Sequence, residues 1–401
     1  MKVSFSKEDI PLFSVFALMV FWEVIQDVLP YVQYVFLLGI LFFNNKKTKL
    51  KISSKFYIVI TIIFIHGLLN VFLGEHKCGL LITQLGVISF CYIAYNSILS
   101  VYNVRQVFEM YWRSAIFVSL YGIIHKVIGI IIGIDTQTRL TSLMGEPAGL
   151  CYFLAPIVVL IIFWYINPSM RDEEFRFINN KWGTVVILLA YFGAFSSVGY
   201  FGLFVAFIIA WWAKGISLKK VFLLVLGAMV AIGLYSYIPD VQIRVDDSIK
   251  VLNTDENEED FTNVNLSTYT LYNNAHVTYE IIKETNGLGI GLGGYQVGFD
   301  KHALYVPLRS NRSSFYLNRE DANSLFLRLI SELGVVGILV VLWWLIHYRV
   351  KINNKYMAYS YCVGVLFVMF LLRSGNYVTD GRILFVCLYT KIYFESLAKN
   401  L

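Results

Sequence analysis

Residues 149–167 read GLCYFLAPIVVLIIFWYIN, a stretch without a single charged side chain. A helix needs about twenty apolar residues to cross the hydrocarbon core of a bilayer, so this stretch predicts a transmembrane helix. The whole chain of 401 residues is similar, with 57% hydrophobic and 15% charged side chains and a mean hydropathy of +0.63. Soluble domains average about a quarter charged residues. The composition therefore predicts a polytopic membrane protein and argues against disorder, a disulfide scaffold and nucleic-acid binding.

Similar apolar runs recur along the chain and together predict an all-α fold of about twelve transmembrane helices. The predicted runs lie at approximately 11–29, 31–43, 56–74, 79–98, 111–134, 149–167, 183–197, 199–213, 220–238, 322–347, 356–373 and 383–397. The second, seventh and eighth runs are short for a membrane span, so we expect tilted helices or tight hairpins there.

Basic residues are concentrated in every second connection between these runs. They are Lys46, Lys47, Lys49, Lys51 and Lys55, then Arg171, Arg176 and Lys181, then Lys214, Lys219 and Lys220, and finally Arg349, Lys351 and Lys355. Cytoplasmic loops of membrane proteins carry excess lysine and arginine, so both termini are predicted to be cytoplasmic. The formal net charge of +6 is then explained by topology and does not imply an acidic partner.

One long polar segment, residues 239–321, interrupts this alternation and is predicted to be a large periplasmic loop. It divides the chain into a first bundle of about nine spans, 1–238, and a second of about three, 322–401. Helical periodicity over 269–295 predicts partial order, with the loop lying over the outer face of the bundle. The five cysteines lie far apart and contain no C-x-x-C pair, so they indicate neither a zinc site nor a disulfide framework.

Within this loop, Gly289–Gly294 reads GIGLGG and matches the pattern G-x-G-x-x-G. That pattern indicates dinucleotide binding only between a strand and a helix of a βαβ unit. In an exported loop of a helical protein we instead expect a flexible or tightly turned glycine segment that joins loop helices.

Ionisable residues inside predicted spans are costly, and they usually face the bundle interior. Arg328 and Glu332 lie one helical turn apart in the run 322–347. Two interpretations are open: a self-neutralising pair that makes insertion tolerable, or a pair that orients a site.

Further charged residues lie at the outer ends of the predicted spans. Arg139 and Glu146 precede the sixth run, whereas Arg373 and Arg382 bracket the last exported turn. Arginine on the non-cytoplasmic side opposes the charge rule and suggests an anionic partner such as phosphate, to which a guanidinium makes bidentate contacts. Glu146-Pro147 also fits the first turn of a helix, because proline is favoured there.

Three segments resemble the O-antigen polymerase and ligase superfamily. Residues 139–150, RLTSLMGEPAGL, are similar to the family's R-x-x-G/S-x-x-x-E/N-P stretch. Residues 286–295, NGLGIGLGGY, are similar to its glycine-rich segment at the end of the large periplasmic loop. Residues 322–337, ANSLFLRLISELGVVG, resemble the beginning of its next helix. The order of the segments and the placement of the loop agree across essentially the whole chain.

Two departures favour one branch of that superfamily. Ligases place histidine where this chain has Ala322, and the family's Ser-Arg turn appears here as Ser196-Ser197-Val198-Gly199, without arginine. Both losses argue against a ligase and favour a Wzy-type O-antigen polymerase. A lipid-linked oligosaccharide flippase is the alternative from another class, although the chain has no obvious internal repeat of the kind transporters often show.

The resemblance implies a fold like that of GT-C-type lipid-donor glycosyltransferases and a place in a bacterial inner membrane. Such a polymerase joins undecaprenyl-pyrophosphate-linked oligosaccharide repeat units at the periplasmic face and needs no metal or other cofactor. Its expected partners are the lipid-linked donor, membrane lipids, a chain-length regulator and a flippase, with no nucleic acid.

Site residues follow from the chemistry that such a reaction requires. Positive charge must stabilise the departing pyrophosphate, and a base must deprotonate the incoming hydroxyl. The predicted pyrophosphate-binding residues are Arg139 and Arg373. The predicted bases are Glu146, then Asp321 and His302. The residues predicted to orient the site are Asn323, Arg328 and Glu332.

Overall fold

The computed structural model describes residues 9–28, 31–43, 54–133, 139–167, 173–212, 266–303, 316–352 and 354–398, together with scattered positions between 225 and 249. Within these ranges every regular element is a helix, and turns and loops join the helices. The N-terminal helices are α1 (Ile10–Val28), α2 (Val32–Phe43), α3 (Ser54–Phe72), α4 (Cys78–Leu99), α5 (Val104–Ile131), α6 (Pro147–Ile166), α7 (Lys181–Gly193) and α8 (Ser197–Trp212). The C-terminal helices are α12 (Leu266–Glu284), α13 (Tyr295–His302), α14 (Leu325–His347), α15 (Met357–Leu372) and α16 (Arg382–Ala398). Short 3₁₀ helices are η1 (Ser142–Met144), η3 (Glu173–Asn179) and η5 (Thr379–Gly381).

The helices match the predicted apolar runs closely, and only the run 220–238 lies largely outside the described residues. In the part of the chain that the structure describes, five helices are long and apolar enough to cross a membrane: α3, α4, α5, α6 and α14. Shorter apolar helices occur at Ile10–Phe21, Val32–Phe42, Lys181–Gly193, Ser197–Ile209 and Met357–Leu372. These helices support a helical membrane protein.

Two helix starts differ from the predicted runs, and local chemistry explains both. Helix α5 begins at Val104, because Asn103 and Gln106 form a reciprocal capping box that initiates the helix before its apolar part. Helix α14 begins only at Leu325, where the Ser324 hydroxyl accepts the Leu327 N–H at 3.3 Å. The two residues before Ser324 have left-handed backbone and cannot extend the helix.

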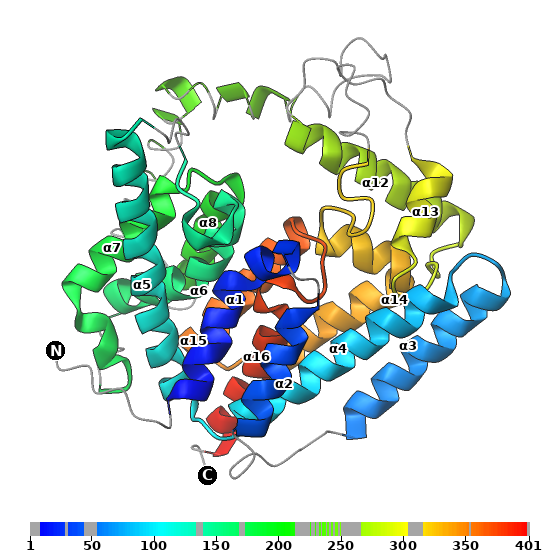
Figure 1. The fold of residues 1–401 in the computed structure, drawn as a ribbon, viewed down its shortest axis with the longest axis horizontal. Helices are drawn as coiled ribbons and strands as arrows, with labels where there is room; N and C mark the ends of the chain where they lie inside the picture. Colours follow the sequence, from blue (N-terminus) through cyan, green and yellow to red (C-terminus); the bar gives the residue numbers. More distant parts are fainter. Residues whose placement is uncertain are drawn as a thin grey trace.

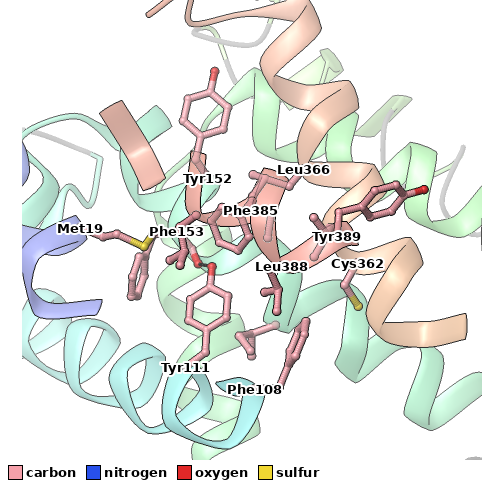
Figure 2. Packing of buried hydrophobic residues seen from close by; sticks show 14 of the residues in the cluster. Met19, Phe108, Tyr111, Tyr152, Phe153, Cys362, Leu366, Phe385, Leu388 and Tyr389 are labelled. Carbon is pink, nitrogen blue, oxygen red and sulfur yellow. Dashed lines mark hydrogen bonds between the residues drawn. The ribbon is translucent and has the colours of Figure 1, made fainter. Parts of the chain in front are cut away.

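Helix α6 is the centre of the bundle and packs against α5, α7, α8 and α15. Figure 2 shows the packed side chains around it, where the Tyr111 ring lies near the rings of Phe153 and Phe385. The Tyr111 hydroxyl donates to the Phe153 carbonyl, which satisfies a polar group inside this apolar core.

Helices α12 and α13 pack on α14 and on each other. They lie on the other side of the molecule from α5, α7 and α8 (Figure 1). Helix α12 confirms the helical periodicity predicted within 269–295. Of the two alternatives expected for the segment between α12 and α13, flexible or tightly turned, the structure shows the tight turn, with left-handed φ at Gly287, Gly289, Gly291 and Gly293. We call residues 287–294 the glycine segment.

The glycine segment lies against a kink in α14. At Gly334 the backbone leaves helical geometry, with φ 69° and ψ −170°. Carbonyl groups just before the kink can therefore accept hydrogen bonds from the glycine segment. The Ile290 N–H donates to the Ser331 carbonyl at 3.0 Å, and the Gly291 N–H donates to the Glu332 carbonyl at 2.8 Å. A Cβ on Gly289 would lie 2.6 Å from the Gly334 nitrogen, so only glycine allows this approach.

Candidate functional site

Two loops meet where α14 and α16 begin and α15 ends: residues 318–324 and residues 373–381. The Ser374 N–H donates to the Asn323 carbonyl at 2.8 Å and joins them. At Gly375 the contact is so close that an added Cβ would lie 1.4 Å from the Asp321 carbonyl oxygen. Glycine at 375 is therefore required for the two loops to meet.

Both loops contain residues in the left-handed region of backbone space. The φ angles are 61° at Ala322, 57° at Asn323, 73° at Ser374 and 57° at Asp380. Each non-glycine residue held in such a conformation costs about 1–3 kcal/mol and persists only where the surroundings enforce it. Strain of this kind concentrates at functional sites, so it marks these loops as a candidate site.

Arg382 lies beneath the two loops and is only 2% exposed. Its Nη2 donates to Asp380 Oδ2 at 2.9 Å and to the Ser374 hydroxyl, while the Phe370 ring covers the guanidinium with its centroid 4.6 Å from Cζ. Its Nε and Nη1 have no hydrogen-bond partner among the described residues. A buried guanidinium with two free nitrogens can still bind an anion.

Further polar groups near Arg382 also lack partners among the described residues. They are the Tyr152 hydroxyl and the Asn323 amide nitrogen, both buried. The Tyr152 ring lies 5.1 Å from Phe370, and its hydroxyl points away from the packed rings in Figure 2. Charges at Asp380, Arg382 and Arg373 act on this phenol. Tyr152, Asn323, Ser374, Asp380 and Arg382 therefore form a cluster that contains several hydrogen-bond donors not used within it.

Arg373 caps the C-terminal end of α15. Its Nη2 donates to the Ser267 hydroxyl at the start of α12, at 2.5 Å. The predicted pyrophosphate ligand Arg373 thus belongs to this cluster and ties α12 to it.

Asp321 and Asn323, both predicted from the sequence, lie in the first of the two loops. Asp321 Oδ1 accepts from the Asn318 amide at 2.8 Å and from the Asn323 backbone N–H at 3.2 Å. Asp321 also lies within electrostatic range of Arg328 and Arg382. The structure therefore brings this carboxylate close to the buried guanidinium groups.

Arg328 and Glu332 form a buried ion pair at 3.0 Å, with side chains 7% and 0% exposed. Glu332 also accepts the Gly293 N–H at 2.8 Å, the Tyr295 N–H at 3.3 Å and the Tyr377 hydroxyl at 2.8 Å. Burial and the adjacent Glu332 carboxylate raise the pKa of Tyr377 well above its ordinary range, so Tyr377 stays a donor.

Arg328, the basic member of this ion pair, contacts two further elements. Arg328 Nη1 donates to the Gly375 carbonyl and Nη2 to the Gln84 side chain of α4, each at 3.3 Å. The Tyr377 ring lies over its guanidinium, 4.4 Å from Cζ to the centroid. The pair therefore joins the glycine segment, α4 and the loop 373–381, which is a structural and orienting position.

Arg139 and Glu146 both precede α6, on either side of η1. The Arg139 Nε donates a long hydrogen bond of 3.4 Å to the Ala194 carbonyl, and its charge acts on Cys151. Glu146 occupies the N-cap position before Pro147, as the helix-start interpretation predicted, and its side chain is exposed.

His302 lies elsewhere. Its Nε2 contacts Glu284 at 2.7 Å at the C-terminal end of α12, whereas Arg373 contacts Ser267 at the other end. Seventeen residues separate Ser267 from Glu284, a rise of about 26 Å along a helix. The structure therefore does not bring His302 together with the other predicted site residues.

The cluster contains Tyr152, Ser374 and Asp380, to which sequence reasoning assigned no role. It also contains Arg382, which the sequence marked only as one of the arginines at a turn predicted to be exported. Among the described residues, no three His, Cys, Asp or Glu side chains gather where they could hold a metal ion. The donor groups suit an anion.

No protein-family model and no curated protein matches the chain.

Proposed function

We propose that the protein is a polysaccharide polymerase that joins undecaprenyl-pyrophosphate-linked oligosaccharide repeat units at the outer face of a bacterial inner membrane. The observation that carries this proposal is Arg382, which is buried between strained loops and whose Nε and Nη1 have no hydrogen-bond partner among the described residues. A pyrophosphate leaving group requires fixed positive charge of this kind in a site shielded from water. The expected inner-membrane location and outward-facing site are part of the proposal.

The reaction needs one bond to break and one to form. The bond between the anomeric carbon and the pyrophosphate oxygen breaks with its electron pair leaving on oxygen, where Arg373 and Arg382 stabilise the charge. The acceptor hydroxyl forms the new bond to that carbon and gives its proton to a carboxylate. Asp321 is the base whose position fits best, because it lies within electrostatic range of Arg382, and Glu146 is the second candidate.

The apolar bundle supplies the surroundings for a polyprenyl carrier. Helices α6 and α15 are apolar over their length and begin or end at the cluster. A lipid whose diphosphate reaches the cluster would keep its hydrocarbon chain within the membrane. A chain-length regulator and a flippase remain expected partners.

Two alternatives act on the same lipid-linked glycan. A ligase would transfer the glycan to lipid A-core, and Ala322 in place of histidine argues against it. A flippase would form no new bond, and it gives no reason for strained loops around a buried arginine.

Purified full-length protein given only the lipid-linked repeat unit tests the proposal. Polymer longer than the repeat unit supports a polymerase, whereas product that forms only when lipid A-core is added indicates a ligase. Transfer of the lipid-linked glycan across vesicles without bond formation indicates a flippase. The Arg382→Gln variant at a matched protein level should form no polymer.

A further inference from the structure

Tyr152 lies in the second turn of α6 and carries a hydroxyl that the rest of the described chain does not use. The side chain is only 3% exposed, and its hydroxyl has no hydrogen-bond partner among the described residues. Burying a hydroxyl without a partner destabilises a folded protein. A tyrosine at this place, where a phenylalanine ring would pack equally well, therefore indicates a partner outside those residues.

The Phe370 ring of α15 places this hydroxyl near Arg382. The centroid of the Tyr152 ring lies 5.1 Å from that of Phe370, and the same Phe370 ring lies 4.6 Å from Arg382 Cζ. Long side chains of a helix lean towards its N-terminal end, and in Figure 2 the hydroxyl points away from the packed apolar rings. Tyr152 and Arg382 also act on each other electrostatically. Unused donors of both side chains therefore lie in one cluster.

Carboxylates already balance part of the positive charge of this cluster. Asp380 Oδ2 accepts from Arg382 Nη2 at 2.9 Å, and Asp321 also acts on Arg382. Arg382 alone therefore supplies no excess of positive charge, although its Nε and Nη1 have no hydrogen-bond partner among the described residues. Neutral donors have to supply part of the stabilisation of an added anion, as hydroxyl and amide groups do in oxyanion holes. The Tyr152 hydroxyl is such a donor.

We propose that the Tyr152 hydroxyl is a further catalytic donor, which hydrogen-bonds the diphosphate oxygen that leaves the anomeric carbon. This inference rests on the proposed polymerase function and deepens it. The electron pair of the broken bond stays on that oxygen, and the added negative charge strengthens the hydrogen bond. The proton of the phenol stays on Tyr152, while the proton of the acceptor hydroxyl goes to the carboxylate base.

The Tyr152→Phe variant removes the hydroxyl and keeps the ring that packs on Phe370. Because the lost hydroxyl has no partner among the described residues, the unfolding temperature should stay equal or rise slightly. The turnover number kcat for polymer formation should fall about 10²-fold, with a smaller change in KM, since the donor acts mainly on charge that develops in the transition state. A lower unfolding temperature with a normal kcat would show a structural hydroxyl and overturn the proposal.

Tyr95→Phe is the matched control. Tyr95 in α4 is fully buried, and its hydroxyl also lacks a hydrogen-bond partner in the part of the chain that the structure describes. The groups that act on it electrostatically are Cys91, Cys387 and Tyr34, and not the charged residues of the cluster. The kcat of Tyr95→Phe should therefore equal that of the unmodified protein.

Binding of undecaprenyl pyrophosphate, measured from the rise in unfolding temperature that it causes, separates this inference from the polymerase proposal. We expect Tyr152→Phe to bind this lipid about ten-fold more weakly than Tyr95→Phe. Equal binding and equal kcat in the two variants would overturn the role of Tyr152 and leave the polymerase proposal intact. Weaker binding by Tyr152→Phe, in a protein that forms no polymer, would support the hydroxyl as a diphosphate donor and overturn the polymerase proposal.

Discussion

The Tyr377 hydroxyl donates to Glu332 Oε2 at 2.8 Å and links the loop 373–381 to the interior of α14. Because Glu332 also holds Arg328 and the glycine segment, one carboxylate connects elements from three distant parts of the chain. The stability of the candidate site should therefore depend on it.

Replacing Glu332 with glutamine should strongly destabilise the protein. The change leaves Arg328 buried without a counter-charge, which typically costs about 3–5 kcal/mol. Thermal unfolding in detergent measures the loss. The matched control is Arg113→Gln, which breaks an i,i+4 pair about a third exposed and should cost at most about 1 kcal/mol. Equal losses in the two variants would contradict this role for Glu332.

Gly375→Ala should separate the two loops of the candidate site. An added methyl group cannot lie 1.4 Å from the Asp321 oxygen, so the backbone must move, at a cost of about 3 kcal/mol or more. We expect loss of polymer formation and a lower unfolding temperature. Gly364→Ala in α15 is the control, since nothing lies within 4 Å of its added Cβ.

Arg382→Lys should reduce polymer formation by about 10²–10³-fold, although it keeps the charge. Lysine lacks the planar set of donors and cannot replace a guanidinium held between Asp380 and Ser374. Polymer yield per amount of purified protein is the measurement. Activity within two-fold of the unmodified protein would exclude Arg382 from the site.

His302→Gln and Asp321→Asn together test which predicted base acts. The distant position of His302 predicts activity within about two-fold of the unmodified protein. Loss of a general base typically costs about 10²–10⁴-fold, and we expect this for Asp321→Asn. A large loss in His302→Gln with an unchanged unfolding temperature would reverse the assignment.

Stability should fall in mildly acidic solution because of His76, which lies between α3 and α4. Its Nε2 donates to the Leu292 carbonyl at 2.8 Å, and burial lowers its pKa below the ordinary value of 6.5. The unfolded chain therefore takes up a proton first as pH falls. The contribution of His76 to the free energy of unfolding is therefore fully present above pH 6.5 and is lost progressively below that value.

Unfolding temperatures between pH 7.5 and 5.5 measure this effect. His76→Gln retains a side-chain donor but does not titrate, so its decline with pH should be shallower. Parallel declines in the two proteins would show that another group is responsible.

Much of the fold was predictable because apolar periodicity decides it. The apolar run 149–167 became α6, and Glu146-Pro147 began it as expected. The pairing of Arg328 with Glu332 also followed from their spacing of one turn. Helix α5 began earlier than predicted, because the capping box at Asn103 outweighs the polar residues that follow it.

The candidate site was only partly predictable, because tertiary contacts assemble it. Asp321, Asn323 and Arg373 were identified by type and position, but Tyr152 reads as one more aromatic residue in an apolar helix. Nothing in the sequence indicates that Ser374 and Asp380 adopt left-handed backbone. The separation of His302 from Arg373 depends on the direction in which α12 runs.

The glycine segment is held mainly by main-chain groups, so its length is constrained more tightly than the identity of most of its side chains. An inserted residue would shift the amides of Gly291 and Gly293 out of register with α14, whereas changing exposed Leu288 would leave those bonds intact. Epitope tags for testing the predicted periplasmic location of residues 239–321 therefore belong outside residues 287–294.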